Sequence, residues 1–373
     1  MPKVYIKTFG CQMNFRDSEI LAGGLQKKGA ELVDNWEEAD IVLFNTCAVR
    51  KHAEDRAFSI LGSIAKKSRQ KGLSKIFGLI GCVAEAYKER AFKRAPYLDI
   101  VCGPNDLYRL VENLGSLAQN KEKLLFTGAQ ARVNEFYRGA WFSDETKHAY
   151  VIIIEGCNNF CSYCIVPFVR GRERSRPYKD ILDEVKVLID EGKNEFTLLG
   201  QNVNSYRAQI GFVELLDKVS KIEGVEKLSF LTSHPKDASR GLFEIMAQRD
   251  NIDKRLHLPF QSGSDRILKL MNRGYTKGRY LQLACDYKRI TGGTLSTDVI
   301  VGFPTETEND FLETKSVLDG AGFDTAYIFK YSPRPHTPAA GLGDDVPKEE
   351  KERRHKILLD MQKKISIKYK IRN

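Results

Sequence analysis

Three cysteines separated by gaps of three and two residues form the motif with the clearest chemistry in this sequence. Cys157, Cys161 and Cys164 lie between Gly156 and Ile165, so three thiolates share one short loop. Zinc ribbons and knuckles use paired C-x2-C elements, and no second pair follows here. Ferredoxin-type runs supply a fourth cysteine. Three thiolates on a [4Fe–4S] cluster leave one iron open to a small chelating ligand, so the spacing favours such a cluster over a purely structural role.

Three further cysteines each follow a strand-like segment and precede a helix-like one. They are Cys11, Cys47 and Cys82. The loops that follow parallel strands share one edge of the sheet, near helix N-termini that favour an anionic group. We therefore predict a second iron–sulfur site with three thiolate ligands. Cys102 follows a fourth strand and is able to complete a four-ligand zinc site, so this alternative stays open; otherwise Cys102 and Cys285 are interpreted as packing residues.

Alternating strands and helices must position Cys11, Cys47 and Cys82, which we call the first triplet. The strand-like segments are Val4–Phe9, Ile41–Phe44, Lys75–Ile80 and Leu98–Val101, and the helix-like segments are Asp17–Lys28, Val49–Lys67 and Ala84–Arg94. This alternation predicts an α/β fold with an open, doubly wound parallel sheet over residues 1–105. A connector, residues 106–145, follows.

A second alternating series must position Cys157, Cys161 and Cys164, which we call the second triplet. Its strand-like segments are Tyr150–Glu155, Glu195–Leu199, Lys227–Leu231, Arg255–Leu258, Leu295–Val301 and Thr325–Tyr331, and helix-like segments such as Ile181–Glu191, Phe212–Ile222, Arg266–Met271, Arg279–Ile290 and Glu308–Ala321 lie between them. Six such units predict a partial (β/α)6 barrel over residues 146–340, with the active site in the loops after the strands. Residues 341–373 are expected to form a basic helical segment.

Length, charge and hydropathy limit the class of protein. The 373 residues exceed the roughly 250–300 at which one core stops growing, which indicates two domains. We expect a cytoplasmic protein with reduced thiols and no membrane contact, because no stretch approaches the length of a membrane span and no signal peptide is recognisable. Ten Lys and Arg against four Asp and Glu after residue 346 account for much of the net charge of +10. A phosphate-binding surface and a solvated helix face both explain this excess.

The second triplet resembles the radical S-adenosylmethionine superfamily, whose hallmark is C-x3-C-x2-C with an aromatic residue, here Tyr163, before the last cysteine. The resemblance implies that the open iron binds the amino and carboxylate groups of S-adenosylmethionine. It also implies that an electron from the cluster breaks the S–C5′ bond and yields a 5′-deoxyadenosyl radical. Tyr163 is accordingly predicted beside the cofactor.

Over nearly the whole chain, the resemblance narrows to the methylthiotransferase family. The motifs that carry it are Thr8–Asn14, Asn45–Cys47, Gly81–Cys82, Leu198–Tyr206, Leu258–Ser264, Met271–Tyr275 and Ile300–Pro304. They are most similar to the tRNA-modifying branch that acts on N6-isopentenyladenosine. The resemblance implies two [4Fe–4S] clusters, two S-adenosylmethionine molecules, a flavodoxin-type electron donor, and methylthio transfer to C2 of an adenine beside the anticodon, in the anticodon stem-loop of tRNA.

Two alternatives to this function remain. Sister branches of the family methylthiolate N6-threonylcarbamoyladenosine in tRNA or a residue of a ribosomal protein. A zinc-bearing nucleic-acid-binding module without catalysis represents another class of protein altogether.

Several residues on the loops after the barrel strands are predicted to contact the cofactor. By the resemblance, Gln201 and Asn202 hold the amino end of S-adenosylmethionine. Ser233 and His234 follow the third strand, where ribose contacts are expected, although His234 is equally explained as a structural histidine. Further contacts to the nucleoside, the substrate or the adenine ring are predicted for Gln261, Asp298, Ile300 and Gly302.

Four arginines alternate just after the cluster loop. In an extended segment, Arg170, Arg172, Arg174 and Arg176 would point to one side, as a clamp for substrate carboxylate or phosphate. A solvated strand in which Glu173 pairs with its neighbours is the alternative.

Members of the family usually continue into a small basic β-barrel domain that binds RNA. This chain stops at Asn373, about where that domain is expected to begin. RNA binding is therefore expected to depend either on such a domain in a longer protein or on other basic surface.

Overall fold

The computed structural model describes residues 1–49, 51–113, 122–129 and 146–372, with side chains as far as residue 365. The chain divides into two compact units. The first unit comprises Met1–Thr146 and Ile165–Glu173, and the second comprises Lys147–Cys164 and Arg174–Asn373. The segment that directly follows the second cysteine triplet therefore belongs to the first unit. Most of the connector predicted at 106–145 lies outside the described residues.

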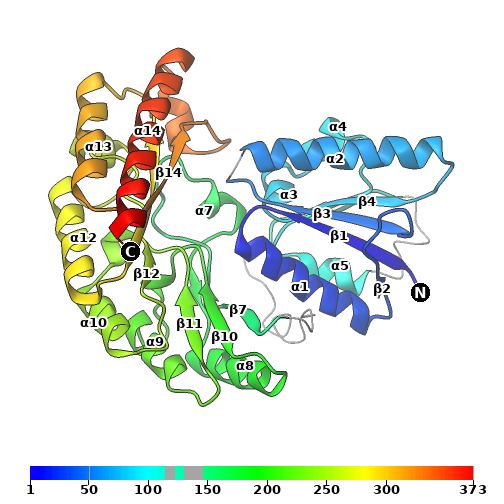
Figure 1. The fold of residues 1–373 in the computed structure, drawn as a ribbon. Helices are drawn as coiled ribbons and strands as arrows, with labels where there is room; N and C mark the ends of the chain where they lie inside the picture. The colour runs from blue at the N-terminus through cyan, green and yellow to red at the C-terminus, as the bar shows by residue number, and fades with distance from the viewer. Residues whose placement is uncertain (50, 114–121, 130–145, 373) are drawn as a thin grey trace. The chain divides into compact units, whose positions relative to one another are not determined.

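A six-stranded parallel sheet forms the centre of the first unit, with strand order β2-β1-β3-β4-β5-β6. The strands are β1 (Lys3–Phe9), β2 (Glu31–Leu32), β3 (Ile41–Thr46), β4 (Ile76–Ile80), β5 (Ile100–Cys102) and β6 (Leu124–Phe126), and the helices are α1 (Gln12–Lys27), α2 (Lys51–Gln70), α3 (Cys82–Tyr87), α4 (Arg90–Arg94) and α5 (Leu107–Glu112). Figure 1 shows α2 and α4 on one face of the sheet and α1 and α5 on the other. The predicted doubly wound fold is confirmed.

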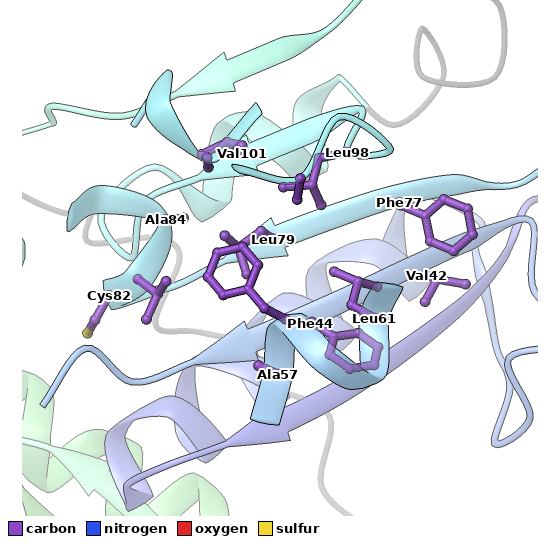
Figure 2. Close-up of a cluster of buried hydrophobic side chains, with 14 of the residues drawn as sticks. Val42, Phe44, Ala57, Leu61, Phe77, Leu79, Cys82, Ala84, Leu98 and Val101 are labelled. Atoms are coloured by element: carbon purple, nitrogen blue, oxygen red, sulfur yellow. The ribbon is translucent and has the colours of Figure 1, made fainter. Parts of the chain in front are cut away.

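Both faces of this sheet are buried because successive strand residues point to opposite sides. On β3, Val42 and Phe44 pack into the cluster beneath α2, whereas Ile41 and Leu43 pack into the cluster beneath α1 and α5. Figure 2 shows the first of these clusters, with Cys82 at one end of it. The apolar strands β1, β3 and β4 thus end just before the loops that carry Cys11, Cys47 and Cys82.

Six parallel strands of the second unit follow one another in chain order, as two sheets of three. They are β7 (His148–Ile152), β10 (Glu195–Leu199) and β11 (Lys227–Phe230), then β12 (Arg255–His257), β13 (Thr294–Val301) and β14 (Thr325–Lys330). The Ser233 hydroxyl donates a hydrogen bond to the carbonyl of His257 and so joins the two halves. This arrangement is the predicted partial barrel.

Helices connect these strands on the outside of the partial barrel (Figure 1). They are α8 (Tyr178–Asp190), α9 (Phe212–Ser220), α10 (Arg240–Gln248), α11 (Asp265–Leu270), α12 (Lys277–Thr291) and α13 (Glu308–Gly320), and α14 (Lys348–Arg372) follows the last strand. The short elements β8 (Ile154–Glu155), β9 (Arg174–Ser175) and α7 (Val166–Val169) adjoin the cysteine loop. None of the described helices combines the length and the apolar character needed to span a bilayer.

Several sequence-based expectations about local structure are wrong. The predicted helix Ala84–Arg94 is interrupted at Lys88, whose φ of 49° ends α3 before α4 begins. The short strands β2 and β6 were not expected. Cys285 is exposed rather than packed, because the buried positions of α12 follow the helical spacing Tyr280, Leu283, Ala284 and Tyr287.

Part of the basic C-terminal stretch serves packing. Arg354 of α14 is buried and pairs with Glu306 at 2.6 Å, and Lys351, also buried, pairs with Asp344. The ring of His355 contacts the carbonyl of Ile328 on β14. These charges anchor α14 to the second unit and are therefore not exposed to a polyanion.

Asp310 connects the loop after β12 to α13. Its carboxylate accepts hydrogen bonds from Ser264 Oγ at 2.6 Å and the Thr307 amide at 2.9 Å, and it pairs with Arg266 at 2.5 Å. Burial alone raises the pKa of Asp310, but these three partners outweigh burial and hold its pKa below the usual range. The carboxylate thereby fixes the loop that carries Gln261.

We expect Asp310→Asn to lower the free energy of unfolding by about 1–3 kcal/mol at pH 7, because charged hydrogen bonds are replaced by weaker neutral ones. The folded-state pKa lies below the unfolded value, so the unfolded state binds more protons as the pH falls. The wild-type advantage must therefore shrink below about pH 4. Urea titrations at pH 7 and pH 3 measure both effects. The control is Asp319→Asn, an exposed change on the same helix; equal losses for the two variants would contradict the role of Asp310.

Candidate iron–sulfur sites

The first triplet lies at the carboxyl ends of three adjacent strands. Cys11 follows β1 and precedes α1, Cys47 follows β3, and Cys82 begins α3 after β4. Adjacent strands lie about 4.8 Å apart, which brings the three thiols to one edge. The Cys11 thiol lies 3.7 Å and the Cys82 thiol 3.9 Å from the same oxygen, Asn14 Oδ1. The structure thus places these cysteines together, as the sequence predicted.

Two glycines permit this close approach. Gly10 has φ of 119°, and a Cβ there would lie 2.3 Å from Cys47 Cβ. Gly81 has φ of 84°, and a Cβ there would lie 2.1 Å from Asn45 Oδ1. Positive φ and missing space both exclude a side chain. The glycine before two of the cysteines is therefore a geometric requirement of the site.

The thiols of this triplet influence one another electrostatically. A hydrogen bond with Cys47 is the main cause that lowers the pKa of Cys11 to about 6. The same bond, together with burial, raises the pKa of Cys47, and burial raises the pKa of Cys82. Such coupling is expected of neighbouring thiols that share one site.

Arg170, which lies just after α7, is part of the first unit and of its cysteine site. Its Nε lies 3.3 Å from Cys82 Sγ, and its Nη2 lies 3.2 Å from Asn14 Oδ1 and 2.5 Å from Asp17 Oδ2. Arg170 is 2% exposed and Asp17 is fully buried. A buried cation thus lies directly beside a cysteine sulfur.

The prediction that the four arginines line one side of an extended segment is wrong. Arg170 ends a short helix and is buried beside Asp17. Arg176 is also buried, where it pairs with Glu184 at 2.7 Å and donates to the carbonyl of Ile152. Arg170 and Arg176 therefore form buried ion pairs inside the protein. Arg174 is half-buried near Glu155, and Arg172 is exposed.

The second triplet lies on the loop between β8 and α7. Cys157 and Cys161 are buried and Cys164 is half-buried. The end of α11 holds this loop: Asn272 Nδ2 donates to the carbonyls of Asn159 and Phe160, and the Ser162 amide donates to the carbonyl of Met271. The motif Met271–Tyr275 therefore shapes the cysteine loop.

Arg273 and His234 approach the sulfur of Cys161. Arg273 Nη1 lies 3.3 Å from this sulfur and 3.3 Å from the Tyr163 hydroxyl. His234 Nε2 lies 4.0 Å from the sulfur, and its Nδ1 accepts the Lys236 amide, which assigns the ring proton to Nε2. Burial, followed by the charge of Arg273, lowers the pKa of His234 to about 2. His234 is thus a neutral donor beside Cys161.

Amide side chains occupy the loops around this triplet. Gln201 Oε1 accepts the Gly156 amide at 2.5 Å, and Asn202 Nδ2 donates to Asp237 at 2.8 Å. Among the described residues, neither Asn202 Oδ1 nor Gln261 Oε1 has a hydrogen-bond partner, although both are buried. Unsatisfied buried acceptors favour a bound donor group. The ammonium of S-adenosylmethionine has the required chemistry.

Of the remaining predicted contacts, Asp298, Ile300 and Gly302 lie on or beside β13, and Ser233 follows β11. Asp298 Oδ2 lies 3.3 Å from the ring of His257, and the Ile300 amide donates to the carbonyl of Gln261. Gly302 follows with φ of 68°. Ser233 is occupied by its bond to His257, so its predicted ribose contact stays a prediction.

Three residues near the sulfurs were missed by sequence reasoning, namely Arg273, Asn14 and Asp17. Arg273 and Asn14 lie inside motifs that carried the family resemblance, which is the signal that pointed to them. Asp17 had no signal, because nothing in its local sequence indicates burial against an arginine that lies 153 residues away.

Cys102 lies on the other face of the sheet from Cys82. It is fully buried in the apolar cluster that contains Ile80 and Ile100. Its surroundings support the packing interpretation over a fourth ligand.

Within the described ranges, no group of three or more His, Cys, Asp or Glu side chains is close enough to hold a metal ion. A [4Fe–4S] cluster separates its ligand sulfurs more widely than a single ion does. Its fit here rests on two sets of three thiols at loop positions, each with a buried arginine 3.3 Å from one sulfur.

Known families match both parts of the chain. "Uncharacterized protein family UPF0004" matches residues 3–103, and "Radical SAM superfamily" matches residues 151–318. The partial barrel with its C-x3-C-x2-C loop and this second match define the class of protein, a radical S-adenosylmethionine enzyme.

Two relatives are both called tRNA-2-methylthio-N(6)-dimethylallyladenosine synthase. That of Thermotoga petrophila is 44% identical over 98% of this chain and 83% of its own length. That of Syntrophotalea carbinolica is 41% identical over 99% of this chain and 85% of its own length. This chain therefore belongs to the family of tRNA-2-methylthio-N(6)-dimethylallyladenosine synthases.

A solved structure shares the fold. The radical S-adenosylmethionine methyltransferase TsrM from Kitasatospora setae matches 91% of this chain and 75% of its own with a TM-score of 0.66 and 14% identity. Identity this low indicates a common fold and nothing more.

We expect Gly81→Ala to abolish most iron and sulfide binding at the first triplet. Its Cβ would collide with Asn45, which is held in place by its bond to the Asn14 carbonyl at 2.8 Å. Iron and sulfide analysis of the Cys157→Ala/Cys161→Ala/Cys164→Ala protein, with and without this change, measures the loss. Gly278→Ala, where a Cβ meets open space, is the control. Full iron retention in Gly81→Ala protein would contradict the expected geometry.

Proposed function

We propose that this protein transfers a methylthio group to C2 of N6-isopentenyladenosine in tRNA, using two [4Fe–4S] clusters and two molecules of S-adenosylmethionine. The single observation that carries this proposal is the presence of two separate cysteine triplets, one in each unit, in a chain more than 40% identical to proteins named for this modification. A binding module would not need both.

Cys157, Cys161 and Cys164 are proposed to hold the cluster that binds S-adenosylmethionine. When bound, this cluster would supply one electron to S-adenosylmethionine, which would break the S–C5′ bond into methionine and a 5′-deoxyadenosyl radical able to take the hydrogen from C2 of the substrate adenine. The Tyr163 hydroxyl accepts a hydrogen bond from Arg273, which also contacts Cys161.

Loops of the partial barrel are proposed to orient the cofactor. The buried acceptors Asn202 Oδ1 and Gln261 Oε1 receive N–H groups of its ammonium, and Gln201 fixes the cysteine loop through Gly156. Gly302 lets backbone approach the adenine ring, beside Ile300. Further polar contacts to S-adenosylmethionine are proposed for Asp298, His234 and Ser233.

Cys11, Cys47 and Cys82 are proposed to hold the second cluster, where the sulfur to be transferred is provided. One S-adenosylmethionine would give its methyl group to that sulfur and leave as S-adenosylhomocysteine, and the other would supply the radical. Arg170, Asn14 and Asp17 keep the thiols in place through the contacts described above.

The proposed partners are the anticodon stem-loop of tRNA and a flavodoxin-type electron donor. Arg172 and Arg174, which are not fully buried, remain proposed contacts to the substrate, whereas Arg170 and Arg176 act through packing. The reaction is proposed to take place in the cytoplasm, where thiols stay reduced. We propose the predicted division into a cluster domain, a connector, a partial barrel and a basic helix, except that Ile165–Glu173 belongs to the first unit.

The names of the relatives favour N6-isopentenyladenosine over threonylcarbamoyladenosine or a ribosomal protein residue. A zinc-binding module without catalysis has no need for the unsatisfied amide oxygens beside the second triplet.

The decisive experiment incubates anaerobically reconstituted protein with a reductant, S-adenosylmethionine and tRNA that carries N6-isopentenyladenosine. We expect mass spectrometry of the digested nucleosides to show the 2-methylthio product. Cys157→Ala should abolish both 5′-deoxyadenosine and product, because it removes the radical source. Cys82→Ala should abolish the product while 5′-deoxyadenosine is still formed.

A matched control is Cys285→Ala, which changes an exposed cysteine on α12 and should leave both products unaltered. Formation of 5′-deoxyadenosine by Cys157→Ala protein, or full methylthio transfer by Cys82→Ala protein, would refute the corresponding site. tRNA with threonylcarbamoyladenosine in parallel tests the sister reaction.

A further inference from the structure

Arg273 is a buried cation without an acidic partner. Its side chain is 4% exposed, and its guanidinium donates to the Pro259 carbonyl at 2.8 Å and the Tyr275 hydroxyl at 3.1 Å. Its remaining contacts are Cys161 Sγ, the Tyr163 hydroxyl and the Tyr275 ring, whose centroid lies 5.3 Å from the guanidinium carbon. Among the described residues, no carboxylate lies within ion-pairing distance of it.

Burial of an unpaired charge is costly, and proteins normally pair such groups. Tyrosine hydroxyls and a carbonyl provide hydrogen bonds to Arg273, and the Tyr275 ring adds a cation–π attraction, but none of these groups carries a negative charge. The Cys161 sulfur is the one neighbour that becomes anionic when it binds iron. The charge of Arg273 is therefore matched only when the second triplet carries its cluster.

Arg170 beside the first triplet differs in this respect. It has the same 3.3 Å contact to a cysteine sulfur, but Asp17 pairs with it at 2.5 Å. The positive charge beside Cys82 is thus neutralised within the protein, and the positive charge beside Cys161 is not.

We propose that Arg273 is a positioning residue that serves as the counter-ion of the cluster on Cys157, Cys161 and Cys164, and that it raises the reduction potential of this cluster. The inference rests on the proposed function, because it requires that a cluster binds there. An oxidised [4Fe–4S] core with three thiolates has net negative charge, and one added electron makes it more negative. A cation 3.3 Å from a ligand sulfur stabilises the reduced state more than the oxidised state.

The forked geometry of the guanidinium is part of this role. Nη1 contacts Cys161 and Tyr163, Nη2 contacts the Pro259 carbonyl, and Nε contacts Tyr275. Lysine carries the same charge but cannot make these contacts together. Charge and geometry can therefore be separated by Arg273→Gln, which removes the charge and retains hydrogen-bond donors, and Arg273→Lys, which retains the charge.

The test uses full-length protein with Cys11, Cys47 and Cys82 changed to alanine, so that only the second triplet binds a cluster. After anaerobic reconstitution, iron and sulfide are counted and the midpoint potential is measured by redox titration followed by electron paramagnetic resonance. We expect Arg273→Gln to shift the potential to a more negative value, and Arg273→Lys to shift it by less than half as much. Arg279→Gln, an exposed change on α12, should leave the potential at the parent value.

An unshifted potential in Arg273→Gln protein with an intact cluster would overturn the proposal. If that variant binds no cluster, thermal unfolding of the cluster-free proteins decides. An unmatched cation predicts that cluster-free Arg273→Gln melts no lower than its cluster-free parent. A lower melting temperature would show that Arg273 is an ordinary structural residue. Failure of the parent itself to bind iron would instead refute the proposed function.

Discussion

Two almost completely buried arginines each place a guanidinium N–H 3.3 Å from a cysteine sulfur. A buried cation is tolerated only where negative charge or hydrogen-bond acceptors surround it. Much of the structure near both triplets follows from this constraint. Asp17 and Asn14 on α1 surround Arg170, while Tyr275 and the Pro259 carbonyl surround Arg273.

The same constraint explains why segments far apart in the sequence contribute to each site. Arg170 comes from the chain just after the second triplet, yet it belongs to the first unit and contacts Cys82. Only a short stretch of chain joins Cys164, the last cysteine of the second triplet, to Arg170, which packs beside the first triplet. The end of α11 plays a comparable part in the second unit, where Asn272 and Arg273 hold the cysteine loop from outside.

Much of the fold was predictable because its signals are local. Apolar strands such as Ile41–Thr46 are buried on both faces, and glycine precedes two of the strand-end cysteines. Regular alternation of such elements leaves few topologies open. The short strands β2 and β6 were missed because two or three residues carry no periodicity, and the break at Lys88 was missed because an apolar pattern continues across it. The arginine clamp failed for a different reason: alternation indicates a common side only in extended chain, and α7 turns the segment at Arg170.

The sequence by itself determined the six candidate ligands, the α/β class of both units and the family, because cysteine spacing and strand-to-helix order are properties of neighbouring residues. Tertiary structure alone decided which other side chains surround the sulfurs. Asp17 and Arg170 are 153 residues apart, and Cys161 and Arg273 are 112 residues apart. Contacts at such separations depend on how whole strands and helices pack, and on which buried charges must find a partner. Neither the packing of whole elements nor the pairing of buried charges can be read from neighbouring residues in the sequence.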